Sequence, residues 1–245
     1  MKIIISPAKN MKVEEYLSPQ TVPVFLANAK EIAKTLQSLT ETELAAVWKI
    51  KDKLLRENIA RLTALDFKRN LTPAILSYDG IQYKYMMPSI FTEAEFSYIA
   101  ANVRILSALY GVLRPLDSVA LYRLEMQAKL EVGTAKNLYA YWGERLYQAV
   151  LDDSRIIVNL ASTEYSKAIS KYLTEKDQFI TCTFGELVGE KVVQKGVYAK
   201  MARGEMVRYL AVNDVQTVEG IKGFDVGYSF DDKRSTASEF VFIKK

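Results

Sequence analysis

The sequence contains no histidine and a single cysteine, Cys182, among its 245 residues. Without histidine the chain can form no Ser-His-Asp or Cys-His nucleophile system, no histidine general base and no metal site with imidazole ligands. A lone cysteine can neither close a disulfide within the chain nor hold an iron–sulfur cluster. Catalysis would therefore have to use Asp, Glu, Lys, Arg, Tyr or Ser, alone or with carboxylate-bound magnesium, and we assign no metal and no cofactor.

The chain also has no apolar run of about eighteen residues, no basic leader followed by an apolar segment and no lipidation signal, so we expect a cytoplasmic protein without a membrane partner. Hydrophobic residues make up 49% of the sequence, which is enough for a sizeable core. Lysine and arginine total 33 against 29 acidic residues, an excess that favours a local basic patch. No linker or repeat interrupts the chain, which predicts one domain over residues 1–245, and we expect a monomer.

Hydrophobic periodicity predicts a mixed α/β fold in which helices surround a mixed sheet. Strands are predicted at 1–5, 155–160, 224–230 and 238–243, and around Cys182. Helices are predicted at 23–36, 40–62, 92–110, 137–150, 161–173 and 198–213. Thr40 with Glu43 and Thr92 with Glu95 have the spacing of capping boxes. Asp79-Gly80, between short apolar runs, is typical of a turn or hairpin.

The most unusual stretch is Leu106–Met126, LSALYGVLRPLDSVALYRLEM. The helix that begins after Thr92 should end at Gly111, and Pro115 keeps Arg114 out of helical torsions, so a tight connection to a second short element near Asp117 is expected. Backbone amides at such a connection could hold a phosphate together with Arg104, Arg114 and Arg123. The alternative is a structural connector whose arginines pair with Asp117 and Glu125.

Three further segments carry candidate phosphate ligands. The strand at 1–5 ends in a loop with Ser6 and Lys9, and the strand at 155–160 ends at Ser162, with Lys167 about one turn into the next helix. Either pair could instead only cap and solvate its loop. In the helix at 198–213, the basic residues Lys200, Arg203 and Arg208 lie off the apolar face, and Gly204 leaves a gap that either admits a phosphate or packs closely on a neighbouring helix.

The sequence resembles the YaaA family of bacterial peroxide-stress proteins. The resemblance covers nearly the whole chain and is carried by ISPAK at Ile5–Lys9, LYGVLRPLD at Leu109–Asp117, YRLEM at Tyr122–Met126, NLAS and EY within Asn159–Tyr165, and ARG with a further arginine within Ala202–Arg208. It implies a single-domain cantaloupe-like fold with a helix-hairpin-helix element, a positively charged cleft and DNA binding. It also implies lower free iron and less oxidative DNA damage under hydrogen peroxide.

Transferred to this chain, the resemblance places the hairpin at Tyr110, Gly111 and Arg114. From the matching motifs we infer a basic cleft formed by Lys9, Arg114, Arg123, Lys167, Lys200, Arg203 and Arg208. The chain departs from the family pattern at Gly80-Ile81-Gln82-Tyr83, where a Gly-Asp-Val-Tyr-like motif is expected, at Ala108 in place of glycine and at Leu121 in place of proline.

Two functions compete at this stage. The first is a DNA-binding protein of the oxidative stress response that contacts backbone and shape and needs no catalytic residue. The second is an enzyme acting on a nucleotide or on a base in DNA, with Glu125 or Glu164 as acid or base. A deep pocket that holds both carboxylates would favour the second, and an open groove the first. Direct iron sequestration is a weaker hypothesis, because carboxylates and phenolates are the only ligands and they form no spaced cluster.

Overall fold

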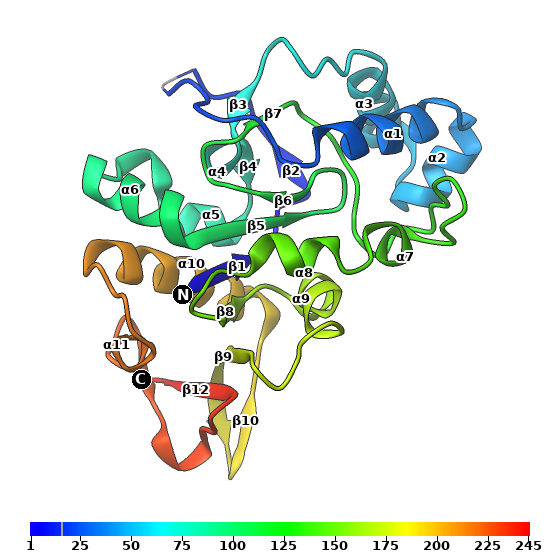
Figure 1. Ribbon diagram of the computed structural model, residues 1–245. Helices are drawn as coiled ribbons and strands as arrows, with labels where there is room; N and C mark the ends of the chain where they lie inside the picture. Colours follow the sequence, from blue (N-terminus) through cyan, green and yellow to red (C-terminus); the bar gives the residue numbers. More distant parts are fainter. Residues whose placement is uncertain (16) are drawn as a thin grey trace.

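The computed structural model describes residues 1–15 and 17–245, in which helices flank a central sheet (Figure 1). The strands are β1 (Lys2–Ile5), β2 (Asn10–Met11), β3 (Thr72–Pro73), β4 (Tyr78–Asp79), β5 (Val103–Ser107), β6 (Gly111–Leu113), β7 (Ser118–Val119), β8 (Ile156–Leu160), β9 (Gln178–Val188), β10 (Lys191–Val193), β11 (Tyr228–Phe230) and β12 (Glu239–Lys244). The α-helices are α1 (Leu26–Gln37), α2 (Glu41–Trp48), α3 (Asp52–Thr63), α4 (Ala74–Ser77), α5 (Ile81–Met86), α6 (Glu93–Asn102), α7 (Leu138–Trp142), α8 (Arg145–Val150), α9 (Thr163–Ser170), α10 (Gly196–Val212) and α11 (Val218–Ile221). Short 3₁₀ turns occupy Pro88–Ile90 and Asp232–Arg234.

The sheet has the order β11-β12-β9-β8-β1-β5-β6, and β10 pairs with β9. Its middle is parallel, because β1 pairs in parallel with both β5 and β8, and β9 with both β8 and β12. The antiparallel strands β6, β10 and β11 lie at its margins. The mixed α/β fold predicted from the sequence is therefore confirmed. The buried β-branched residues Ile3, Ile4 and Ile5 place β1 at the centre of the core.

The order of the parallel strands in the sheet reverses at β1, so that the next strands along the chain lie on opposite sides of it. The chain passes from β1 to β5 on one side of it, whereas β8, on its other side, leads on to β9 and β12. In open α/β sheets the crevice outside the carboxyl ends of two such strands is the usual position of a ligand. The fold therefore directs attention to the residues that follow β1 and β8.

The helix predicted from Thr92 to Tyr110 is shorter than expected. Its capping box is present, since Thr92 Oγ accepts a hydrogen bond from the Glu95 amide, but α6 ends at Asn102. The next residues form β5, which pairs with β6 in an antiparallel hairpin and with β1 in parallel. The expected helical connection at Gly111 is therefore wrong. A short buried apolar run has no periodicity that separates a strand from a helix.

Helices α5 and α10 pack closely against each other (Figure 1). Of the turn or hairpin predicted at Asp79-Gly80, the hairpin is not formed, because Asp79 ends β4, which pairs with β2, and Gly80 is the N-cap of α5. A Cβ atom at Gly204 of α10 would lie 2.1 Å from the Gln82 carbonyl oxygen. Of the two interpretations of Gly204, the structure supports close helix packing, and the expected phosphate gap between Lys200 and Arg208 is filled by the α5 backbone.

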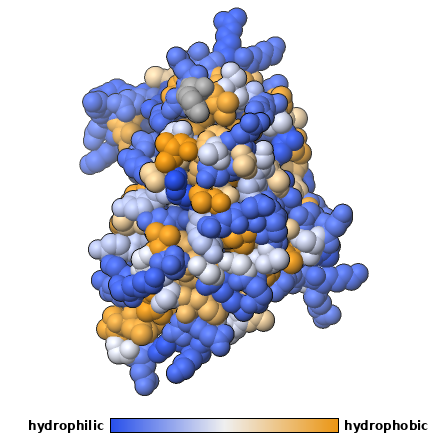
Figure 2. Space-filling model, turned by 90° about the vertical axis from the view of Figure 1, so that its left-hand side faces the viewer, coloured by the Kyte–Doolittle hydropathy of each residue, from blue (hydrophilic) through white to orange (hydrophobic). Residues whose placement is uncertain are grey.

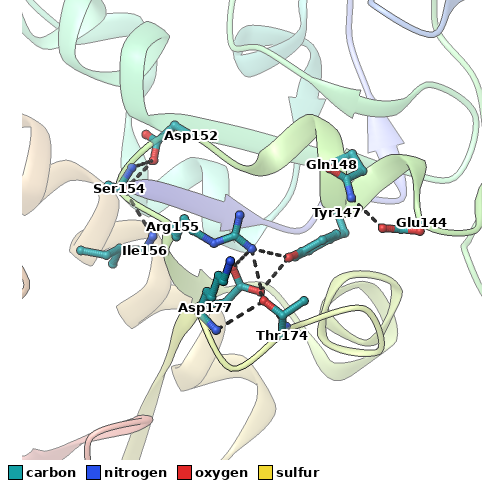
Figure 3. Close-up of polar contacts among 10 residues, drawn as sticks. Glu144, Tyr147, Gln148, Asp152, Ser154, Arg155, Ile156, Thr174 and Asp177 are labelled. Atoms are coloured by element: carbon teal, nitrogen blue, oxygen red, sulfur yellow. Dashed lines mark hydrogen bonds and ion pairs between the residues drawn. The ribbon is translucent and has the colours of Figure 1, made fainter.

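A polar cluster ties α8 to the strands β8 and β9 (Figure 3). Asp177, whose side chain is fully buried, accepts hydrogen bonds from the Tyr147 hydroxyl at 2.7 Å and from the Thr174 amide at 2.6 Å. It also forms an ion pair with Arg155 at 2.7 Å. Burial raises the pKa of Asp177, but the hydrogen bonds and the guanidinium outweigh this effect, and its pKa is lowered. The charged carboxylate is therefore the form that stabilises the fold.

This lowered pKa predicts a pH-dependent contribution to stability. An acid whose pKa is lower in the folded state stabilises the protein above its unfolded pKa of about 4, and the stabilisation disappears as the pH falls through the folded value. We expect Asp177→Asn to lower the free energy of unfolding by about 2 kcal/mol at pH 7, with the difference from wild type shrinking below pH 4. Urea denaturation of wild type and Asp177→Asn at pH 7, 5 and 3 measures this difference in the free energy of unfolding. The exposed Asp153→Asn is the control, and an equal deficit at pH 3 and pH 7 would contradict the assignment.

The face formed around α6, α10 and α11 is mostly hydrophilic, with small separate hydrophobic patches (Figure 2). Within the described residues, no helix combines the length and the apolar character that crossing a membrane would require.

Candidate anion-binding cleft

The residues that follow β1 and β8 are held together by two serines. The Ser162 amide donates a hydrogen bond to Ser6 Oγ at 2.8 Å, and the two hydroxyl oxygens are 3.2 Å apart. Both serines line a cleft of about 310 Å³ at the position that the strand order indicates. The sequence placed both residues at strand ends, but only the sheet order brings them into contact.

Four basic side chains line this cleft, and they come from three separate parts of the chain. Lys9 follows β1, Arg123 follows β7, and Lys200 and Arg203 project from α10. Helix α10 can present both of its residues because they are three positions apart and therefore lie on one side of the helix. Four predicted phosphate ligands thus converge at the carboxyl edge of the sheet.

Three of these cations have no acidic partner in the described part of the chain. The ion pairs formed there include Lys9 but not Arg123, Lys200 or Arg203. The Nε atoms of Arg123 and Arg203 are buried and make no hydrogen bond. Burial lowers the pKa of Arg203, and the Cys182 thiol, which acts in the opposite direction, is itself neutral because burial raises its pKa to about 12. A half-buried cation without a counter-charge is costly, and an anionic ligand would offset that cost.

The acids that line the cleft have partners of their own. Glu125 forms an ion pair with Lys9, and Asp79 forms one with Lys84 at 3.4 Å. Glu164 accepts a hydrogen bond from the Gln127 amide at 3.2 Å. Burial is the main cause that raises the pKa of Glu164, and the charge of Glu125 adds to it. The cleft is therefore lined by two ion-paired carboxylates and by one carboxyl group that takes up a proton more readily than usual.

Buried tyrosines line the cleft, and the sequence analysis did not identify them as part of a site. Tyr122 lies 2.8 Å from the Tyr78 hydroxyl and 2.7 Å from the Ser107 hydroxyl, oxygen to oxygen, and Tyr83 donates to the Ser6 carbonyl at 2.9 Å. Burial raises the pKa of Tyr122 to about 12. Because these hydroxyl groups bond within the protein, Tyr83 and Tyr122 offer the cleft mainly ring surface. The motif YRLEM contained Tyr122, but no sequence signal distinguished it from a core residue.

Gln82 is a second residue that the sequence analysis did not assign to the site. It lines the cleft from α5 and is only 7% exposed, yet its Nε2 atom has no hydrogen-bond partner within the described residues. Its place in the departure Gly80-Ile81-Gln82-Tyr83 marked it as unusual, but its missing partner is visible only in three dimensions.

Five other predicted residues do not reach the cleft. Tyr110 and Gly111 are buried in the β5–β6 hairpin, where a Cβ atom on Gly111 would lie 2.8 Å from the Trp142 ring. Arg114 pairs with Asp117 at 2.9 Å, as the connector alternative required. Lys167 lies over the Tyr139 ring, 4.2 Å from its centroid, and Arg208 lines a separate groove between α5 and α10. The expected convergence beside Gly111 is therefore wrong, and the cations meet at the ends of β1 and β8 instead.

Comparisons with known proteins all indicate the same family. Residues 1–234 match the family model described as peroxide stress protein YaaA. A UPF0246 protein of Agathobacter rectalis is 52% identical over 100% of this chain and 99% of its own length. A UPF0246 protein of Lactiplantibacillus plantarum is 50% identical over 99% of both chains, and one of Pediococcus pentosaceus is 48% identical over 100% of this chain and 98% of its own. The sequence motifs, the fold and these full-length matches together show that the chain belongs to the YaaA family of peroxide stress proteins.

Proposed function

We propose that this member of the peroxide stress family binds DNA in the cytoplasm through the cleft and thereby limits oxidative damage to DNA. The observation that carries the proposal is the set of three cations, Arg123, Lys200 and Arg203, that face one cleft without an acidic partner among the described residues. Phosphate is the anion that such a set fits, because arginine donates to it in a fixed fork and lysine adds a point charge.

The stretch Leu106–Met126 contributes to this function differently from the expectation. A helix-hairpin-helix would present amides at Gly111, but Gly111 is buried. The segment instead supplies Arg123 to the cleft after the strands of the hairpin have ended. Side-chain contacts with phosphate therefore replace hairpin amides in the proposal.

The salt dependence of DNA binding tests this function. Three unpaired cations should give a slope of log affinity against log salt of about −2 to −3, and Lys200→Gln should flatten the slope by roughly 0.7–0.9. Fluorescence anisotropy with single-stranded, bubble and duplex oligonucleotides at several salt concentrations measures both values.

Arg56→Gln on α3 is the matched control, because it removes one exposed positive charge outside the cleft. It should leave the slope unchanged. Equal effects of the two substitutions would mean that the net charge of the protein, and not the cleft, attracts DNA.

A second candidate function is an enzyme acting on a nucleotide or on a base in DNA. The observation that favours it is the presence of Glu125 and Glu164 in one cleft, where burial raises the pKa of Glu164 and Glu125 forms an ion pair with Lys9. A carboxyl group with a raised pKa in a cleft is a typical candidate for a general acid. Release of a free base or phosphate from DNA or nucleotides on incubation with the protein would be its signature.

A further inference from the structure

The size of the cleft limits what can enter it. Its volume of about 310 Å³ lies at the lower end of the range for small-molecule pockets, about 300–1,000 Å³. Its three unpaired cations can neutralise about three phosphates at most, fewer than the roughly 6–10 phosphate contacts of a protein with strongly salt-dependent DNA binding. The dimensions and the charge thus suit one nucleotide unit better than a length of double helix.

Other residues that line the cleft have the chemistry that a nucleobase requires. Tyr83 and Tyr122 line the cleft with hydroxyl groups that are already bonded, which leaves their rings for contact with a flat ligand. Proteins that take up single bases commonly stack them on aromatic side chains and bond their polar edges.

Gln82 adds a polar group to this lining. A buried amide nitrogen without a hydrogen bond is costly, and a ligand that accepts a hydrogen bond from Nε2 would offset that cost. The backbone of Gln82 is held in place, because its carbonyl packs against Gly204 of α10, the residue next to Arg203. The Gln82 amide, which lacks a hydrogen-bond partner, and the Arg203 guanidinium, which lacks an acidic partner, therefore line the same cleft from two helices that pack together.

We propose that the cleft binds a single nucleotide, with its phosphate on Arg203, Lys200 and Arg123 and the edge of its base on the carboxamide of Gln82. Adenine is the base we expect, because a glutamine carboxamide pairs with its N6 donor and N7 acceptor in a bidentate contact. The nucleotide enters either free or as an unstacked unit of a DNA strand. The inference rests on the proposed function and adds the class of ligand and the residue that selects it. Gln82 is one of the positions at which this chain departs from the family pattern, so the proposal concerns this chain.

The test compares ligands that share the phosphate and differ in the base. Isothermal titration with 2′-deoxyadenosine 5′-phosphate, 2′-deoxyinosine 5′-phosphate and 2-deoxyribose 5-phosphate should give the adenine nucleotide an advantage of about 10- to 100-fold over both. Gln82→Leu, an apolar side chain of similar size, should remove the advantage over the inosine nucleotide and leave the affinity for deoxyribose phosphate unchanged. Thermal unfolding of Gln82→Leu and of a second variant, Gln82→Met, checks that the fold is intact.

The possible failures can be told apart. Equal affinity for all three ligands, or an equal loss for all three in Gln82→Leu, would overturn the role of Gln82 while DNA binding that depends on Lys200 survives. If neither DNA nor any of the phosphate ligands binds, the proposed function itself fails.

Discussion

Replacing Arg203 with methionine should make the free protein more stable and, at the same time, weaken its binding of phosphate ligands by about 100-fold. Arg203 is half-buried, its Nε atom has no partner, and no ion pair of the described residues includes it. Desolvation of its charge lowers its pKa, which shows that the fold disfavours the cation. Methionine keeps the long apolar part of the side chain and removes the charge, so we expect a gain of about 1–2 kcal/mol in the free energy of unfolding.

The expected loss of affinity for phosphate ligands also follows from the half-buried position of Arg203. In a half-buried position the guanidinium interacts with a phosphate more strongly than an exposed charge does, and charge-assisted hydrogen bonds contribute about 1.5–3 kcal/mol each. Urea denaturation gives the stability, and the shift of the unfolding temperature with added nucleotide or phosphate gives the affinity. Wild type should be stabilised by the ligand, and Arg203→Met should not.

The control for this prediction is Arg56→Met on α3, which removes an exposed arginine and should change both quantities little. A less stable Arg203→Met variant would show that the arginine packs as a structural residue. If added ligand raised the unfolding temperature of Arg203→Met as much as that of wild type, the phosphate would not bind at Arg203.

The sequence predicted features that depend on neighbouring residues and missed features that depend on contacts between distant segments. The capping boxes at Thr40 and Thr92 were predicted correctly because both partners lie within one helical turn. Helix α10 and the strands β1, β8 and β12 were also predicted, since their periodicity or β-branched runs are local signals. Strand β5 was missed because its buried residues continue the apolar pattern of α6.

Predicting the site required knowledge of contacts between distant residues to a greater degree than predicting the helices and strands did. Lysines and arginines were identified by residue type, but type alone could not separate Arg203, which lacks a partner, from Arg114, which has Asp117. Ser6 and Ser162 are more than 150 positions apart, and their contact follows only from the pairing of β1 with β8. The sequence marked Gln82 only as part of a departure from the family pattern, and its unpaired Nε2 atom is visible only in the structure. Contacts and missing contacts across the sheet therefore decide which candidates form the cleft.

The second large effect is expected at the contact between α5 and α10. Gly204→Ala should lower the free energy of unfolding by about 3 kcal/mol or more, although alanine is the better helix former by roughly 1 kcal/mol. The added Cβ would lie 2.1 Å from the Gln82 carbonyl oxygen and 2.9 Å from the Met86 amide nitrogen. Both are backbone atoms, so no rotamer change can relieve the overlap, and α5 has to move away from α10.

That movement should also reduce ligand binding, because α5 carries Gln82 and Tyr83, and Tyr83 ties the helix to the Ser6 carbonyl. Gly196→Ala is the control within the same helix, since a Cβ atom there would meet no atom within 4 Å. It should leave binding unchanged and alter stability by less than about 1 kcal/mol. Urea denaturation of both variants measures their stability, and nucleotide titration measures their affinity for the ligand. If Gly204→Ala were as stable as Gly196→Ala, the close packing that positions Gln82 beside Arg203 would be wrong, and the account of base recognition would fail with it.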